Sequence, residues 1–345
     1  MKAWKNSASL ILAVRHNSQF DQALACQSCN YRLLCLKRQE TSSFMPGAYV
    51  FPGGLTEIAD ADLKWQKLFL KFGLTNNFFT SLLPQSDNRP LIFKSEPNEL
   101  RKEISLRITA IRETFEESGI LLCRQKKDPE DLKWGQYIEG EEVNSWQIKV
   151  QKDASKFYEM CESLQCVPDL WALQEWSNWL TPAFLDKKRY NTIFYFAALP
   201  TLPQTKLQHT EMADLQWDYP NNFLSNADIF LPSPQLYEIT RMSKFKQIND
   251  LFKCAILRNS IGTQLWLPVK VSLANGFVAI LPGDSMYPAK VDLIKTEAII
   301  EDNKTIEDFQ RISFVKNRIE FHDSGERRIV VENFKSIEEN VSSML

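Results

Sequence analysis

The feature that most constrains this chain is a predicted helix that buries one face and gathers charged residues near its end. From about residue 98, apolar residues recur at spacings of three and four, which keeps them on one narrow face of a helix. These residues are Ile104, Ile108, Ile111 and Phe115. The helix ends in the sequence Arg112-Glu113-Thr114-Phe115-Glu116-Glu117-Ser118-Gly119, where glycine suits the left-handed conformation that ends many helices. The three glutamates fall on the face opposite the apolar stripe.

Three carboxylates so close together require a positive partner. On a helix, Glu113 is a neighbour of both Glu116 and Glu117, so their charges repel unless a cation lies among them. A hard divalent metal ion is the partner that carboxylate oxygens prefer. An isolated trio of this kind is more often a solvated acidic face. Here Arg112 before the first glutamate and Gly119 at the helix end favour a metal site.

A second stretch, Phe51-Pro52-Gly53-Gly54, breaks the chain after a short predicted strand. Glycine lets the backbone approach a ligand closely, so Gly53 and Gly54 are candidates for substrate binding. Standing alone, the stretch would be interpreted as a tight turn. Because the glutamate-rich helix follows, it resembles the first half of the Nudix box, and Arg-Glu-x-x-Glu-Glu-x-Gly followed by Ile120 resembles the second half.

The box is interrupted. The usual Nudix box runs from glycine through five residues to glutamate, and then through seven residues to Arg-Glu. Five residues lead from Gly54 to Asp60, but 51 residues separate Asp60 from Arg112, so 44 extra residues interrupt the box. The aromatic-rich insertion, roughly 58–101, is expected to fold as one or two helices over the site. The acids available for the displaced first position, none of them expected to be an indispensable ligand, are Glu57, Asp60 and Asp62.

Two further candidates lie after the helix. Arg189 ends the basic cluster Lys187-Lys188-Arg189 before a predicted strand at 193–199, and a guanidinium can bind a phosphate with two hydrogen bonds. Such a cluster is otherwise a solvated turn. Glu211 ends a loop before a predicted strand at 215–217, from where it could reach the metal site as a fourth ligand or act as the base. A surface glutamate is an equally good interpretation.

The remaining pattern predicts an α/β fold. The other expected elements are strands at 8–15 and 31–38, a charged loop-like segment at 125–154, a helix at 154–164 and a long helix from Ser233 to about residue 256. Beyond the long helix, alternating segments predict a small β-rich extension. With the resemblance to the Nudix box, this order implies an α/β/α sandwich with a mixed sheet. We divide the chain into a Nudix domain at 1–256 and a C-terminal extension at 257–345.

Composition excludes some classes of function. A formal net charge of −2 does not suit a general polyanion binder. The sequence contains no apolar window of 18 residues, the length that a membrane-spanning helix needs. Seven cysteines, an odd number with irregular spacing, indicate a reducing compartment instead of a disulfide framework. Cys26 and Cys29 form the only CxxC motif. A structural zinc site would need two more ligands, and with three histidines in the chain no second half is evident.

Longer segments resemble the nucleoside diphosphate-linked moiety X motif 19 family of Nudix hydrolases over nearly the whole chain. Besides the interrupted box, the segments are Met45–Gly54, Trp176–Pro182, Arg189–Thr192, Leu231–Glu238 and Leu281–Pro288. The resemblance implies hydrolysis of coenzyme A and acyl-CoA to 3',5'-ADP and (acyl-)4'-phosphopantetheine. It also implies that Glu113, Glu116 and Glu117 are the Mg²⁺ or Mn²⁺ ligands. Asn191 departs from an expected aspartate, which leaves catalysis untouched.

The chemistry follows from charge. A diphosphate repels hydroxide, so metal ions that bridge the carboxylates and the diphosphate are needed to neutralise its oxygens and to generate hydroxide near neutral pH. Arg112, four residues before Glu116, can pair with that carboxylate and hold it in a ligating pose. The alternatives are a Nudix hydrolase of a nucleotide sugar, a dinucleotide or an RNA cap, and a non-catalytic binding module. The intact glutamate cluster argues against a binding module. We expect a small-molecule substrate, and no nucleic acid apart from the cap.

The resemblance also bears on location. Members of this family are associated with peroxisomes, and the terminal Ser343-Met344-Leu345 shares the first and last residues of the Ser-Lys-Leu peroxisomal signal. It lacks the basic middle residue. We expect a peroxisomal location, with a mitochondrial or cytoplasmic one as the alternative.

Overall fold

The computed structural model describes residues 4–16, 29–86, 88–126, 134–185, 188–295 and 298–334. By their contacts, the residues divide into two compact units. The larger unit comprises 6–177 and 192–263, and the smaller unit comprises 1–5, 178–191 and 264–345. That the chain folds as two domains divided after residue 256 stays a prediction.

The main sheet of the chain is mixed. Its strands are β1 (Lys5–Arg15), β2 (Tyr31–Arg38), β3 (Tyr49–Val50), β4 (Gly53–Leu55), β7 (Gln174–Leu180), β8 (Tyr190–Leu199), β9 (Met212–Asp218) and β10 (Leu265–Trp266). They are ordered β10-β7-β8-β1-β2-β3, with β4 paired to β1 and β9 paired to β2. β2 is antiparallel to β1, β3 and β9, whereas β10 is parallel to β7. The strands predicted at 8–15 and 31–38 are confirmed.

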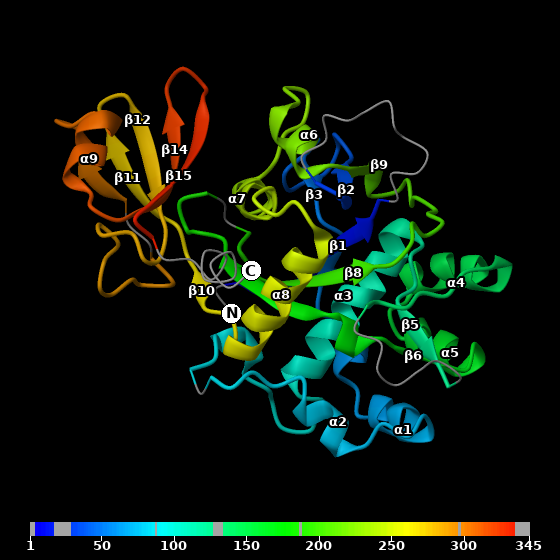
Figure 1. Cartoon of the computed structure of the whole chain (residues 1–345). Helices are drawn as coiled ribbons and strands as arrows, with labels where there is room; N and C mark the ends of the chain where they lie inside the picture. The colour runs from blue at the N-terminus through cyan, green and yellow to red at the C-terminus, as the bar shows by residue number, and fades with distance from the viewer. Residues whose placement is uncertain are drawn as a thin grey trace. The chain divides into compact units, whose positions relative to one another are not determined.

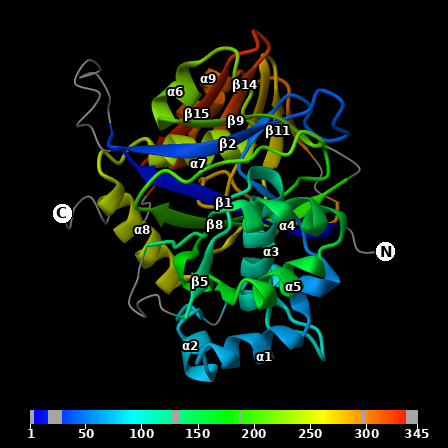
Figure 2. The same ribbon diagram turned by 90° about the vertical axis from the view of Figure 1, so that its right-hand side faces the viewer.

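Helices cover both faces of this sheet. Leu34 and Leu36 of β2 belong to the same buried cluster as the apolar side of α3 (Lys102–Ser118). On the other face, the hydroxyl of Tyr31 donates to the carbonyl oxygen of Met242, the last residue of α7 (Ser233–Met242). Both views show α3 on one side of β1 and α7 on the other (Figures 1 and 2). The predicted α/β/α sandwich is confirmed.

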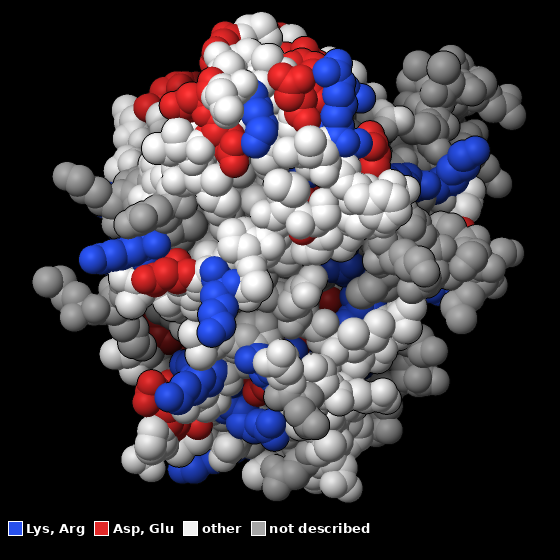
Figure 3. All heavy atoms as spheres, turned by 90° about the vertical axis from the view of Figure 1, so that its left-hand side faces the viewer, with Lys and Arg blue, Asp and Glu red and all other residues white. Residues whose placement is uncertain are grey.

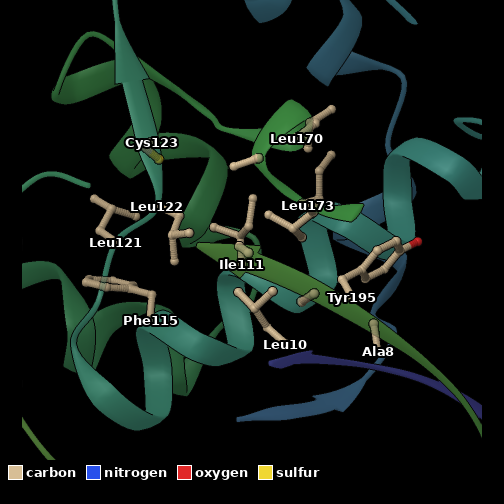
Figure 4. Packing of buried hydrophobic residues seen from close by; sticks show 14 of the residues in the cluster. Ala8, Leu10, Ile111, Phe115, Leu121, Leu122, Cys123, Leu170, Leu173 and Tyr195 are labelled. Atoms are coloured by element: carbon tan, nitrogen blue, oxygen red, sulfur yellow. The ribbon is translucent and has the colours of Figure 1, made fainter. Parts of the chain in front are cut away.

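The core surrounds α3. Ile111 and Phe115 pack in one cluster with Leu10 of β1 (Figure 4). Thr109 and Thr114, on other sides of the helix, are fully buried as well. The side chains of Glu113 and Glu116 are 15 % and 12 % exposed, so the glutamates do not form a solvated acidic face. The helix is enclosed because α4 (Glu141–Lys152), the 3-10 helix η4 (Leu170–Ala172) and β4 all contact it.

The insertion in the Nudix box adds to the same core. Its elements are η2 (Ile58–Ala61), α1 (Lys64–Lys71), α2 (Asn76–Thr80) and η3 (Leu91–Phe93). The ring centroids of Trp65 and Phe157 in α5 (Lys156–Ser163) lie 5.8 Å apart, and those of Phe69 and Trp171 lie 6.3 Å apart. The predicted helices are present. Their buried aromatic residues extend the core, and the placing of these helices over the site stays a prediction.

Two segments differ from the prediction. Residues 141–152 form α4 where a charged loop is predicted, because Val143, Gln147 and Val150 make a buried stripe that includes a polar residue. The predicted long helix is two helices, α7 and α8 (Ile248–Ile261). Tyr31 donates to the carbonyl oxygens of both Met242 and Phe245, which a continuous helix would use itself. The remaining elements of this unit are β5 (Cys123–Gln125), β6 (Cys166–Pro168) and α6 (Pro220–Ser225).

The smaller unit contains a second sheet, ordered β13-β11-β12-β14-β15. Its elements are β11 (Val269–Leu273), β12 (Gly276–Ile280), β13 (Ile299–Glu301), β14 (Lys316–His322), β15 (Arg327–Glu332) and α9 (Ile306–Ile312). In the turn at 281–288, both carboxylate oxygens of Asp284 accept hydrogen bonds of 2.7 Å from Arg318, which anchors the turn to β14. The predicted β-rich extension is confirmed.

Two expectations from the composition can be compared with the structure. Among the described residues, no helix is long and apolar enough to cross a membrane. Acidic and basic side chains are interspersed over the face drawn in Figure 3, in keeping with the small net charge. Cys26 of the CxxC motif, Lys187 and the terminal Ser343-Met344-Leu345 lie outside the described residues.

Candidate active site

Arg112 fixes the last turns of α3. Its side chain is 2 % exposed, and its Nη1 donates to Oε1 of Glu116 at 2.7 Å and lies 2.9 Å from a carboxylate oxygen of Glu113. Nη2 donates to the backbone carbonyl oxygen of Leu55 in β4 at 3.0 Å. The predicted pair of Arg112 and Glu116 is confirmed. One guanidinium holds two of the glutamates and joins them to β4.

Asp60 occupies the displaced first position of the box. Nε and Nη2 of Arg112 donate to its two carboxylate oxygens at 2.8 and 2.9 Å, and the hydroxyl of Thr109 donates at 2.7 Å. Asp60 is 2 % exposed, whereas Glu57 and Asp62 are exposed. Asp60 is thus the acid that the sequence leaves undecided. It orients Arg112, and through Arg112 the glutamates.

Gly53 and Gly54 leave space that a side chain would fill. The N–H of Gly53 donates to Oε2 of Glu117 at 2.9 Å. The φ angle of Gly53 is 154°, and a Cβ there would lie 2.5 Å from the carbonyl oxygen of Ala8. A Cβ on Gly54 would lie 2.4 Å from the carboxyl carbon of Glu113. The two glycines let β4 approach β1 and two carboxylates, and their role in substrate binding stays a prediction.

The three glutamates at the end of α3 have raised pKa values. The pKa of Glu113 is raised to about 8, chiefly because burial disfavours its charged form; Arg112 opposes the shift and Glu116 adds to it. The pKa of Glu117 is raised well above its ordinary value by burial and by the charge of Glu113. Burial also raises the pKa of Glu116, again against Arg112. Burial is thus the main cause of all three shifts, and the neighbouring arginines offset it only in part.

The loop before β9 brings Glu211 to this cluster. The backbone N–H groups of Lys206 and Gln208 donate to the carbonyl oxygens of Ser118 and Glu117 at 2.8 and 3.0 Å. The loop thereby satisfies carbonyl oxygens that the end of α3 leaves free. Burial is the main cause of the raised pKa of Glu117, and Glu211 contributes to it, so the two carboxylates lie near each other. Whether Glu211 is a ligand or the base stays a prediction.

Gln147 of α4 belongs to the site although sequence analysis missed it. Its side chain is 2 % exposed, and its Nε2 donates to the carbonyl oxygens of Glu116 at 3.0 Å and Lys206 at 2.8 Å. It therefore ties the end of α3 to the loop that carries Glu211. The available signal was a glutamine between two apolar residues at helical spacing, Val143 and Val150.

Arg38 supplies another positive charge. It is the last residue of β2, and it lowers the pKa of Glu117 against the larger, raising effect of burial. Its Nε is buried and has no hydrogen-bond partner among the residues that the structure describes. Sequence analysis missed Arg38 as well, and the signal was a pair of charged residues, Lys37 and Arg38, after the buried run of a strand.

Arg189 has partners in the smaller unit. Its Nε donates to the carbonyl oxygen of Thr181 at 2.7 Å, and its Nη1 donates to that of Ile294 at 3.2 Å. The guanidinium carbon also lies 5.6 Å from the ring centroid of Trp4. These contacts join three segments of the smaller unit. Phosphate binding by Arg189 stays a prediction.

The donor set fits a hard divalent metal ion. Glu113, Glu116, Glu117 and Glu211 offer carboxylate oxygens, the ligand type that Mg²⁺ and Mn²⁺ prefer. Burial is the main cause of the raised pKa values of Glu113, Glu116 and Glu117, and a bound cation would oppose these shifts. Among the described residues only three cysteines, Cys123, Cys161 and Cys166, have ligand atoms all within 4.8 Å of one another, so the glutamate side chains would have to move together to hold one divalent ion.

The chain is similar to known proteins over most of its length. The family model for the NUDT19 Nudix domain matches residues 4–242, and that for the NUDT19 C-terminal domain matches residues 270–332. Two relatives, each named acyl-coenzyme A diphosphatase NUDT19, are 35 % identical. The match to the Xenopus laevis protein covers 89 % of this chain and 87 % of the relative, and the match to the Gallus gallus protein covers 98 % and 91 %.

A solved structure is similar in fold. The crystal structure of a NUDIX hydrolase from Alicyclobacillus acidocaldarius is 18 % identical and has a TM-score of 0.53. The similarity covers 72 % of this chain and 96 % of that chain. At this identity the likeness supports the fold alone.

Proposed function

We infer the reaction of this chain from its family: the chain belongs to the NUDT19 family of Nudix hydrolases. The proposed reaction is hydrolysis of the diphosphate bond of coenzyme A and acyl-CoA, which gives 3',5'-ADP and (acyl-)4'-phosphopantetheine. The relatives' printed name supports the substrate. The observation that carries the proposal is the intact glutamate cluster, which Asp60 orients through Arg112.

A divalent metal ion belongs to the proposal. Nudix hydrolases in general use divalent metal ions, and we infer Mg²⁺ or Mn²⁺ here because the cluster offers only carboxylate oxygens. Glu113, Glu116 and Glu117 would hold the ion. When bound, it supplies positive charge to the diphosphate oxygens and lowers the pKa of a water molecule.

The chain's own residues prepare the reaction. Arg112 fixes the carboxylate of Glu116 through a hydrogen bond of 2.7 Å, so this carboxylate is already oriented before the substrate binds. Glu211 is proposed to accept the proton of the attacking water. The buried Nε of Arg38 offers an unused donor beside Glu117, suited to a diphosphate oxygen.

Product identification tests the proposal. The purified chain is incubated with Mg²⁺ or Mn²⁺ and with free CoA, a short-chain acyl-CoA, ADP-ribose, a dinucleotide or capped RNA, and products are identified by mass spectrometry. We expect 3',5'-ADP from the CoA substrates and much slower turnover of the others. If no CoA substrate yields 3',5'-ADP, the proposed substrate is wrong. Turnover of another compound would then identify the substrate.

We also propose a peroxisomal location. The support is the membership of a family whose members are associated with peroxisomes. A fluorescent protein is fused to the N-terminus of the chain. We expect the fusion to co-localise with a peroxisomal marker. A mitochondrial or diffuse cytoplasmic signal from the intact fusion contradicts the proposal.

A further inference from the structure

Three cysteines meet in the core of the larger unit. Cys123 begins β5, Cys161 lies in α5 and Cys166 begins β6, and their Sγ atoms all lie within 4.8 Å of one another. All three are fully buried and belong to one apolar cluster, in which Figure 4 shows Cys123 beside Leu122. None of them takes part in the CxxC motif.

The chain turns sharply to bring these thiols together. After α5 ends at Ser163, Gln165 adopts a φ of 50°, a left-handed conformation that residues other than glycine rarely take. The chain reverses there, so that β6 pairs with β5 and Cys166 lies opposite Gln125. Cys123, two residues earlier on β5, is on the same face of the pair. The sulfur atoms therefore converge from two strands and a helix.

The strand register favours a bridging ion over a disulfide between Cys123 and Cys166. The two residues are diagonal neighbours on an antiparallel pair, and such neighbours are about 7–8 Å apart. Disulfides usually join Cα atoms separated by about 4.4–6.8 Å. Zinc–thiolate bonds of about 2.3 Å place sulfur atoms about 3.8 Å apart, so the observed cluster needs to contract by only about 1 Å.

Ligand type and charge narrow the choice of ion. Thiolates select soft ions such as Cu⁺ and Zn²⁺. With three thiolates, a monovalent ion leaves two negative charges in an apolar cluster, whereas a divalent ion leaves one, and each buried charge is costly. We propose that Cys123, Cys161 and Cys166 supply three thiolate ligands of a buried structural site for a thiophilic divalent ion of the zinc type. Among the described residues no fourth His, Cys, Asp or Glu ligand lies with them, so a water molecule would complete the four-coordinate shell that zinc prefers. The ion ties the β5–β6 pair to α5.

Cobalt substitution tests this site without relying on activity. The full chain is produced in medium supplemented with Co²⁺, washed with a chelator to strip exposed ions, and examined by absorption spectroscopy and metal analysis. We expect the near-ultraviolet charge-transfer band of thiolate-bound cobalt and about one retained ion per chain. Glu117→Gln, which alters only the carboxylate site, should keep the band.

Cysteine variants provide the matched comparison. Cys166→Ser should lose most of the band and the retained ion, whereas Cys35→Ser, at another fully buried cysteine in β2, should keep both. If Cys166→Ser does not fold, the spectrum of the unsubstituted chain decides. A cobalt-grown chain without the thiolate band, or thiol titration after denaturation that reveals a disulfide among the three cysteines, overturns the proposal.

Discussion

The backbone N–H of Gly53 donates a hydrogen bond of 2.9 Å to Oε2 of Glu117. Glu117 is 6 % exposed, and burial together with the charge of Glu113 raises its pKa well above the ordinary value. A single backbone donor from β4 thus orients a carboxylate whose charge the surrounding protein does not neutralise. We expect this of a residue that shares a cation with its neighbours.

Replacing Glu117 with glutamine keeps its shape and removes its charge. We expect Glu117→Gln, and likewise Glu116→Gln, to lower turnover by on the order of 100-fold or more, the scale for losing a charged contact to the transition state. For Glu117→Gln, the metal-free variant should unfold at the same or a higher temperature, because the cost of burying an ionisable carboxyl group is gone. Product assays and thermal unfolding with and without Mg²⁺ measure both effects. A folded variant that keeps most of its metal-dependent activity would refute the assignment.

Asp60 and Asp62 form a matched pair for testing the anchor of Arg112. Asp60→Ala leaves a buried guanidinium without its main partner, which costs about 3–5 kcal/mol of unfolding free energy in comparable cases. Asp62→Ala, at an exposed position two residues away, removes a hydrogen bond from the backbone N–H of Lys64 and should cost less, about 1 kcal/mol. Urea unfolding of both variants gives the comparison. Equal stability of the two variants would show that Asp60 does not hold Arg112 in solution.

Local sequence predicts the elements of this site better than their connections. The apolar runs of β1 and β2 and the stripe that ends in Phe115 are local signals, because strand and helix periodicity need only a short window. The choice of Asp60 is not local. The five-residue spacing from Gly54 leads to Asp60, but the insertion removes the spacing from the acid to Arg112, and the tertiary contact with Arg112 is what distinguishes Asp60 from its acidic neighbours.

The missed features share a physical cause. Gln147 places a polar residue in the apolar stripe of α4, and this segment is therefore predicted as a charged loop. In the structure the side-chain amide of Gln147 donates to carbonyl oxygens on α3 and on the loop before β9. The three clustered cysteines come from elements separated in sequence, whereas the CxxC spacing draws attention elsewhere. Both features depend on contacts between segments that are distant in the sequence. Composition and periodicity carry no information on such contacts.

Gln147 is expected to act on the reaction through Glu116 and Glu211. Gln147→Ala removes two hydrogen bonds and leaves two carbonyl oxygens unpaired, at a cost of about 1–3 kcal/mol. We expect kcat to fall by about tenfold or more with a smaller change in KM, because the glutamates lose their orientation while much of the substrate contact remains. Lys152→Ala, at an exposed position on the same helix, is the control. A variant of Gln147 that loses stability but keeps kcat would assign it a purely structural role.

Metal binding should be coupled to proton release. The pKa of Glu113 is raised to about 8, so at pH 7 this carboxyl is mostly protonated in the metal-free chain. A divalent ion must displace that proton, and its apparent affinity should rise with pH up to about pH 8 and then level off. Calorimetry in two buffers of different ionisation enthalpy measures the protons released. Binding enthalpies that do not depend on the buffer would contradict the raised pKa.

The same shift sets how metal-free stability depends on pH. An ordinary glutamate has a pKa of 4.5, so between pH 4.5 and about pH 8 the unfolded chain has lost a proton that folded Glu113 retains. Because the folded state binds more protons in this range, its contribution to the unfolding free energy falls as pH rises, and it stops changing above about pH 8. Mg²⁺ should restore stability most strongly at the alkaline end. Urea unfolding of Glu113→Gln, which lacks the titrating group, should show a weaker pH dependence across this window and a smaller gain from Mg²⁺.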